Sequence, residues 1–285
     1  MEKIFTFGDY CKNKFGRRIP KIVFDISSDS NKSCKHRELT GGCSYCLPES
    51  FEVESYKGTL KEQKNHALKN RDLKDIRFWS YLQHGTPTAI DEKILFSSCK
   101  ELLEDDQSVG LIIASRPDTL KSSFLEFLKD LGSQKEIWIE VGLQSSHDET
   151  LKKINRGYNF ACFVECMEKI ASYRKFRTGV HLIIGLPDET VELILETVNK
   201  INYLPVDGVK FHQLQIVKGT NLAGEYNKNP WRLMDWMEYA DIIIKSIRLL
   251  KETKIILRMV ARTKKDFLIA PQWDMNNQDI IKYIR

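Results

Sequence analysis

The chain has 285 residues, of which 42% are hydrophobic and 29% are charged, and its net charge is +5. No stretch approaches the roughly 20 consecutive apolar residues of a membrane span, and the first sixteen residues lack the apolar core of an export signal. These properties exclude a membrane-spanning helix and predict a soluble, cytoplasmic protein whose core is large enough for one α/β domain.

Apolar runs alternate with amphipathic segments along the chain. The predicted strands are rich in Ile, Val, Leu and Phe, as strands buried on both faces are. In chain order they are Lys21–Ser27, Ile76–Gln83, Val109–Ser115, Ile137–Gln144, Val180–Gly185, Gly208–Val217 and Lys254–Val260. The amphipathic segments predict helices at Asp91–Glu104, Leu120–Leu131, Phe160–Tyr173, Thr190–Leu204 and Met234–Thr253. Such alternation predicts a parallel sheet with right-handed crossovers.

Six or seven such units favour an α/β fold built as a partial or full (β/α) TIM-like barrel, with a doubly wound open sheet as the alternative. We expect one domain over 1–285, in which 1–20 form an extension, 21–260 the barrel core and 261–285 a short C-terminal segment. Both folds bind ligands at the carboxyl ends of their strands. Polar or glycine-bearing motifs follow four predicted strands: Gln83–Thr86, Ser115–Asp118, Gln144–Ser146 and Gly185–Glu189.

Three cysteines, Cys34, Cys43 and Cys46, follow the first predicted strand on one glycine-bearing segment. The chain holds seven cysteines, an odd number that argues against a disulfide framework and for metal or redox chemistry. A structural zinc site normally closes with four ligands, whereas three thiolates on a four-iron cluster leave one iron free to bind a substrate. A zinc site completed by His36 or a distant cysteine is the alternative. Tyr45 is either a packing aromatic or a ring that stacks on an adenine.

With these motifs in place, the sequence resembles radical SAM enzymes, and among them the YhcC/YtqA-type proteins related to the radical domain of the elongator catalytic subunit. The resemblance extends over nearly the whole chain. It is carried by Phe15-Gly16, Gly41–Cys46, Ser115–Asp118, Glu140–Gln144, His147-Asp148, Ile154–Gly157, Ala161-Cys162, His181–Pro187, Asp207–Lys210, His212, Ile216–Gly219, Ala270-Pro271 and Trp273.

The resemblance implies a 4Fe-4S cluster on the three cysteines and S-adenosylmethionine (SAM) bound at the open iron, with reductive cleavage to a 5′-deoxyadenosyl radical. It also implies flavodoxin or ferredoxin as electron donor. YtqA-type proteins convert the carboxymethylaminomethyl group of the tRNA wobble uridine to aminomethyl, so tRNA is the implied substrate, in keeping with the basic pI near 8.7. A small-molecule or peptide substrate, or a zinc-stabilised RNA-binding module without catalysis, are the alternatives.

The resemblance also suggests where SAM binds. Gln83, His84, Gly85 and Thr86 stand where radical SAM barrels contact the methionine amino group, although the segment also reads as a turn. Further cofactor-binding candidates are Arg116, Glu140, Gln144, Arg156, His181 and Gly185, of which Glu140 and Gln144 are four apart on one strand and are expected to face the same side. Arg156 is either the partner of the SAM carboxylate or a surface arginine.

Substrate contacts are expected from the last strands. Lys210 and Lys218 are the candidates for an anionic substrate, with solvated lysines as the alternative. His212 and His181 are either catalytic or hydrogen-bonded core residues. Cys162 and Cys166 are one helical turn apart and are expected to be buried thiols.

Two departures from the family pattern concern the substrate. Cys34-Lys-His-Arg-Glu replaces the usual Cys-Pro-Asn-Arg-Asp-Gly stretch, and the chain stops soon after Trp273, so a C-terminal segment common in relatives is expected to be reduced or absent.

Overall fold

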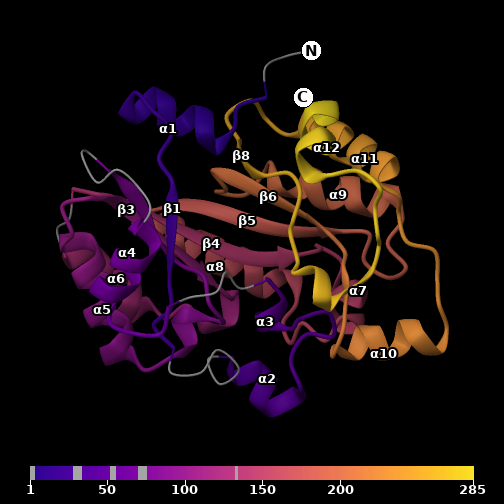
Figure 1. The fold of residues 1–285 in the computed structure, drawn as a ribbon, viewed down its shortest axis with the longest axis horizontal. Coiled ribbons are helices and arrows are strands. Elements are labelled where there is room, and N and C mark those ends of the chain that lie inside the picture. The colour runs from indigo at the N-terminus through magenta and orange to yellow at the C-terminus, as the bar shows by residue number, and fades with distance from the viewer. Residues whose placement is uncertain (1–3, 28–33, 52–55, 70–75, 132–133) are drawn as a thin grey trace.

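A seven-stranded parallel sheet forms the centre of the protein. The computed structural model describes residues 4–27, 34–51, 56–69, 76–131 and 134–285. The strand order is β1-β2-β3-β4-β5-β6-β8. Because the strands of this sheet follow one another in chain order and the order never reverses, the doubly wound alternative is excluded. The sheet curls but keeps β1 and β8 as edges, so the predicted barrel is confirmed in its partial form (Figure 1).

The strands of the large sheet lie where the apolar runs predicted them. Their bounds are β1 Lys21–Phe24, β2 Phe78–Leu82, β3 Ser108–Ser115, β4 Glu136–Gln144, β5 Arg177–Ile184, β6 Gly208–Gln213 and β8 Ile255–Arg258. Every residue of β2 is buried, as are nearly all of β3 and β4. Burial on both faces explains why these strands have continuous apolar sequences.

Helices cover the outer face and both ends of the sheet. Their bounds are α1 Phe7–Phe15, α2 Lys35–Thr40, α3 Pro48–Phe51, α4 Leu60–Leu68, α5 Glu92–Glu104, α6 Ser122–Asp130, α7 Asp148–Lys153, α8 Phe160–Ser172, α9 Val191–Ile201, α10 Asn221–Lys228, α11 Trp236–Leu249 and α12 Asn277–Ile284. The five predicted helices correspond to α5, α6, α8, α9 and α11. Their starts follow from the sequence, since Asn159, Thr190 and Asp235 cap α8, α9 and α11 through side-chain oxygens.

The amino-terminal end of the half-barrel is closed by α1. Thr6 and Asp9 form a capping box that starts this helix. Its Phe7 ring lies 5.6 Å from both Trp79 and Trp138, and all three belong to one buried cluster. Residues 4–20 therefore pack against the half-barrel, and ligands have to enter from the other end.

One predicted strand was wrong in its extent. The run Gly208–Val217 was predicted as a single strand, but β6 ends at Gln213, and Ile216–Val217 form β7 in a separate antiparallel pair with β9, Leu268–Ala270. The Gln213 side chain explains the break, because it donates to the Ala261 carbonyl at 3.1 Å and accepts from the Ala261 N–H at 2.8 Å. Hydrophobicity alone does not reveal this side-chain bond.

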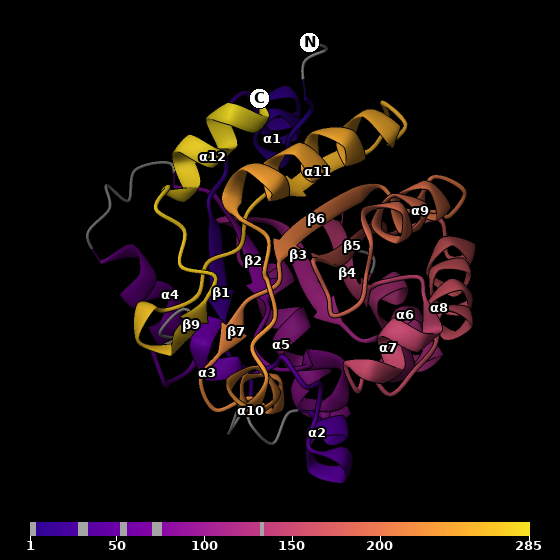
Figure 2. The same cartoon turned by 90° about the vertical axis from the view of Figure 1, so that its right-hand side faces the viewer.

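The segment after β8 returns across the open side of the half-barrel. Figure 1 labels β8, where the segment starts, and Figure 2 shows its later part running from β9 to α12, which packs beside α11. In the same view β7, β9, α10 and the α2–α3 region gather at one end of the sheet, opposite α1. Within the described residues, no helix combines the length and apolarity that crossing a membrane demands.

Candidate active site at the carboxyl ends of the strands

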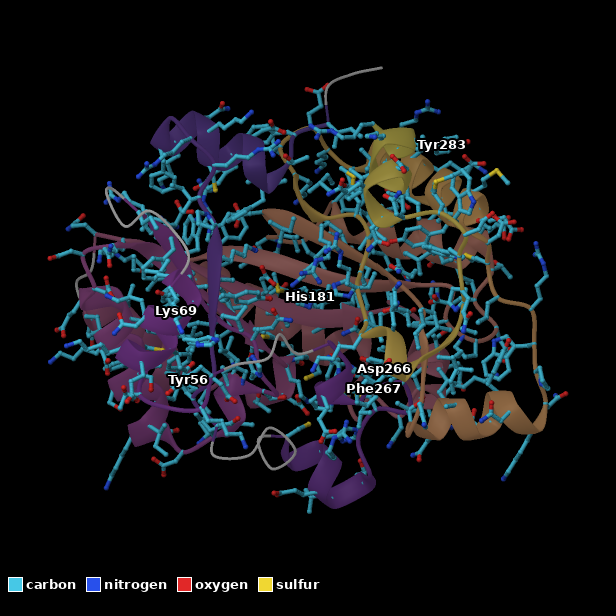
Figure 3. All side chains as sticks on the ribbon, viewed as in Figure 1. Tyr56, Lys69, His181, Asp266, Phe267 and Tyr283 are labelled. Atoms are coloured by element: carbon cyan, nitrogen blue, oxygen red, sulfur yellow. The ribbon has the colours of Figure 1, made fainter. Side chains whose placement is uncertain are left out.

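A cavity of about 520 Å³ opens inside the half-barrel, where strands end and the cysteine segment begins. The side chains around it come from almost every part of the fold. Sequence-predicted lining residues are Cys34, Cys43, Tyr45, Cys46, Gln83, Gly85, Thr86, Arg116, Gln144, Arg156, His181, Lys210 and His212. Figure 3 shows His181 near the middle of the sheet, above Asp266 and Phe267 of the returning segment. The fold thus brings dispersed sequence motifs to one chamber.

The cysteine segment is held in place by hydrogen bonds to residues that are distant in the sequence. Cys34 is the residue before α2, and Gly41 and Gly42 both adopt φ of 80°, which turns the chain back after this short helix. The Ser44 N–H donates to the Ile154 carbonyl at 2.9 Å, and the Asn155 side chain donates to Gly42. A segment with little regular structure therefore has a fixed position.

Two arginines surround Cys43. Nη1 of Arg156 donates to the Cys43 sulfur at 3.2 Å, and Nη1 of Arg116 lies 3.7 Å from it. Burial raises the pKa of the Cys43 thiol, but the Arg156 charge, a hydrogen bond from His36 and the Arg116 charge outweigh burial and lower it to about 6. Cys43 is therefore prepared to be a thiolate, the form that binds iron.

The other two thiols complete the set. Cys34 and Cys46 are half-buried and, like Cys43, are not in a disulfide. Arg37 donates to the Cys46 carbonyl. Among the residues that the structure describes, no three His, Cys, Asp or Glu side chains converge on a single metal ion. Three reduced thiols on one cavity wall, with guanidinium donors at a sulfur, fit an anionic cluster whose properties depend on hydrogen bonds to its sulfurs.

Below the cavity, the carboxylate of Glu140 forms short polar contacts with several side chains. Oε2 of Glu140 accepts from Nζ of Lys210 at 2.9 Å and from the Tyr81 hydroxyl at 2.7 Å, and it lies 2.7 Å from Nε2 of His181. His181 pairs in register with Lys210, and Lys210 with Arg258, so three basic residues form a row across β5, β6 and β8. We call these three residues the basic row.

The charges in this region are strongly coupled. Burial acts to raise the pKa of Glu140, but the charges of Lys210 and Lys21 outweigh it and hold that pKa well below its usual range. Burial lowers the pKa of Lys210 to about 7 against the attraction of Glu140. Burial and the Lys210 charge together lower the pKa of His181 to about 4, so this histidine is neutral at physiological pH.

Several predicted site residues lie off the cavity wall. His84 is buried with Nδ1 3.9 Å from Asp25, and Lys218 is exposed beyond β7. Gly185 turns the chain after β5 at φ 88°, next to Met234. Glu140 lies beneath the cavity rather than on it, because a register shift between Gly142 and Gln144 breaks the alternation that was expected to align Glu140 with Gln144.

Other residues on or next to the cavity wall were missed by the sequence reasoning. Tyr158 stacks against both Arg116 and Arg156 and donates to the Gly142 carbonyl. Arg258 lines the cavity as the last residue of β8; it lies inside the predicted run Lys254–Val260, whereas the search for polar residues was made at the predicted strand ends. Asn277 and Gln278 line the cavity from α12, and no local pattern in the sequence indicates this.

Comparison with family models gives two matches that together span most of the chain. Residues 33–201 match the Radical SAM superfamily, and residues 206–285 match the Radical_SAM C-terminal domain.

Individual proteins match over nearly the full length. The chain is 31% identical to protein YhcC of Escherichia coli over 95% of this chain and 87% of that protein. It is 27% identical to the protein YtqA of Bacillus subtilis over 98% of this chain and 88% of that protein. A solved structure of Elp3 from the archaeon Methanocaldococcus infernus shares the fold with a TM-score of 0.65 and 17% identity, over 79% of this chain and 57% of that one.

Proposed function

Because this chain belongs to the Radical SAM superfamily, whose members cleave SAM at a 4Fe-4S cluster, we propose that it is a radical SAM enzyme acting on the wobble uridine of tRNA. Its cofactors are the cluster and SAM, as in family members of the same fold. The proposed reaction converts a carboxymethylaminomethyl side chain to aminomethyl. A flavodoxin or ferredoxin is the proposed electron donor.

In this proposal Cys34, Cys43 and Cys46 hold the cluster, which when bound supplies the electron that makes SAM a source of a 5′-deoxyadenosyl radical. The protein orients the reactants and excludes water. Arg116 and Arg156 stabilise the anionic sulfur end of the site. Nε of Arg156 is buried and has no partner among the described residues, which leaves one donor for the SAM carboxylate.

The remaining predicted contacts follow the cavity wall. Gln83, Gly85 and Thr86 are proposed to contact the methionine amino group, and Tyr45 to pack on the adenine. Gln144 is the proposed ribose contact. Glu140, by contrast, acts through Lys210 and His181, which it positions from beneath.

The observation that carries the substrate proposal is the composition of the cavity wall. Its cationic and neutral polar groups suit a nucleotide carrying a carboxylate. The substrate class is the one that the resemblance to YtqA-type proteins implies, and the chain is similar to YtqA over nearly its whole length. A net charge of +5 suits phosphate contacts outside the cavity.

Two experiments test this function in sequence. Anaerobically reconstituted protein should be brown and should release 5′-deoxyadenosine from SAM with dithionite, whereas a colourless protein holding one zinc would contradict the enzyme. Nucleoside mass spectrometry of tRNA from a deletion strain should then show carboxymethylaminomethyl uridine accumulating at the expense of later forms. Unchanged wobble uridines would remove tRNA as the substrate and leave a small molecule or peptide.

A further inference from the structure

We propose that Arg258 anchors an oxyanion of the substrate on the β6–β8 side of the cavity, an inference that rests on the proposed function and adds the chemistry of its substrate subsite. For the proposed tRNA substrate this oxyanion is the carboxylate of the carboxymethylaminomethyl group. The argument begins with the charges on the cavity wall.

The described lining of the cavity contains no Asp or Glu. It contains six side chains that are cationic at neutral pH in their usual state: Arg37, Arg116, Arg156, Lys210, Arg258 and Arg262. Cations concentrated in a cavity with low-dielectric walls attract anions. The question is which of these cations is available to a ligand.

Four of the six are already engaged. Arg37 donates to the carbonyl of Cys46, and Arg116 forms an ion pair with Asp118 at 2.8 Å. Arg156 donates to the Gly142 carbonyl and to a cysteine sulfur. Lys210 forms the ion pair with Glu140. Each of these cations therefore has a structural partner or faces the cysteine end of the cavity.

Arg258 is different. It is half-buried, and within the described part of the chain it forms no hydrogen bond or ion pair. Its register partner across the strand pair is Lys210, a like charge. A half-buried guanidinium beside another cation destabilises the fold unless an anion joins it. Nε2 of His212, on the same cavity wall, is also buried without a partner.

A guanidinium recognises carboxylate and phosphate groups through two parallel hydrogen bonds. An arginine held without a protein partner is therefore suited to receive such a group from a ligand. Arg262 also lines the cavity and lacks a partner among the described residues, but it is exposed, so water screens its charge. Arg258 and Arg262 thus form a matched pair that differs mainly in burial.

The first test measures stability and is independent of tRNA. Arg258→Gln removes an unpaired charge, so the melting temperature of the holoprotein without substrate should rise by about 2–4 °C. Acetate or phosphate should raise the melting temperature of the wild type, relative to chloride at equal ionic strength, by more than it raises that of the variant, because general salt effects are common to both proteins. A fall in melting temperature, or equal anion effects on both proteins, would show a structural role and overturn the inference.

The second test measures turnover of tRNA that carries the carboxymethylaminomethyl group. Arg258→Gln should raise KM about 10- to 100-fold, the loss expected for a hydrogen bond to a charged group. Its SAM cleavage without substrate should stay at the wild-type rate. Arg258→Lys should recover part of the affinity, and Arg262→Gln should change KM by less than about threefold. Reduced SAM cleavage in Arg258→Gln would instead place the residue in the SAM site and overturn the subsite.

The two sources of an oxyanion are separated by the form of the tRNA. If the carboxylate is recognised, Arg258→Gln weakens binding of the carboxylate-bearing tRNA and leaves binding of the aminomethyl product tRNA unchanged. An equal loss for both tRNAs would assign Arg258 to a phosphate and overturn the carboxylate assignment. A wild-type enzyme that leaves tRNA unchanged contradicts the proposed function, and the anion stabilisation test then decides the Arg258 site alone.

Discussion

The two ends of the half-barrel are built from the same strands but differ in chemistry. At the amino-terminal end, α1 covers Trp79 and Trp138 with an aromatic cluster. At the carboxyl end, the cavity is lined by thiols, cations and amides. Parallel strands place all their carboxyl ends on one side, where loops can vary without disturbing the core. Residues that stabilise the fold and residues suited to chemistry therefore lie at opposite ends of the strands. The basic row lies between the aromatic cluster at one end and the cysteines at the other.

The largest expected effect would come from the cysteine end. Cys43→Ser should abolish the visible absorption of the reconstituted cluster and reduce SAM cleavage to background, because a hydroxyl is a poor iron ligand. Far-ultraviolet circular dichroism should stay unchanged. Cys162→Ser is the matched control, since Cys162 is a half-buried thiol on α8 away from the cavity lining, and it should keep both signals. Loss of the cluster in the control as well would break the comparison.

At the opposite end, Trp79→Ala should destabilise the protein without affecting chemistry. Trp79 is fully buried and its Nε1 donates to the Cys11 sulfur at 3.4 Å. Removal of its ring should cost roughly 3–5 kcal/mol of unfolding free energy, measured by anaerobic denaturant titration. SAM affinity per folded molecule should remain within about twofold of the wild type. A much weaker affinity would show that the two ends are coupled.

Glu140→Gln probes the layer between the ends. The change leaves Lys210 without its counterion, and we expect a loss of about 2–3 kcal/mol in unfolding free energy. The loss is smaller than for a fixed buried charge because burial already lowers the pKa of Lys210, which can release its proton. Glu101→Gln, on the exposed face of α5, is the control and should change stability by less than about 0.5 kcal/mol.

The smallest effect concerns pH. The folded pKa of His181 is about 4, below its ordinary value of 6.5, so between these values the unfolded chain binds more protons. The contribution of His181 to stability should therefore rise with pH across this window. Burial raises the pKa of Glu189 to about 7, so Glu189 contributes with the opposite sign, and the effect of His181 is measured as the difference between the wild type and a His181 variant. Glu140, with its pKa held low, adds a loss of the same sign as that of His181 below about pH 4.5.

His181→Gln should remove the part of this dependence that lies above about pH 4.5. We expect the stability difference between pH 6.5 and pH 4.5 to shrink by about 2 kcal/mol, measured by denaturant titration at each pH. An unchanged slope in the variant would mean that another group titrates in this window.

Much of the fold could be predicted because buried parallel strands carry an uninterrupted apolar signal. The confirmed strands Val109–Ser115 and Ile137–Gln144 show this directly. The predicted strand Gly208–Val217 failed because its end depends on the bond between Gln213 and Ala261, which are 48 positions apart. Helix α1 was not predicted, since its apolar contacts lie on strands that come later in the chain.

The cysteine triplet could be singled out from sequence because its three thiols lie on one segment with a characteristic spacing. The triplet, its glycines and the strands that follow led to the prediction of a radical SAM fold with a cluster and SAM, and family membership confirms the fold and the cofactors. What the sequence could not decide was how charges separated by many residues compensate one another.

Only the tertiary structure decided that question. Lys210 was expected to meet an anionic substrate, yet the fold places it on Glu140, 70 positions away. Arg258 attracted no notice in the sequence, yet the β6–β8 register places it beside Lys210 with no partner of its own among the described residues. Local patterns determine which helices and strands form, because burial of one face or of both faces leaves a characteristic spacing of apolar residues along the sequence. Charge pairing depends on distances in space, and these exist only after the strands have come together.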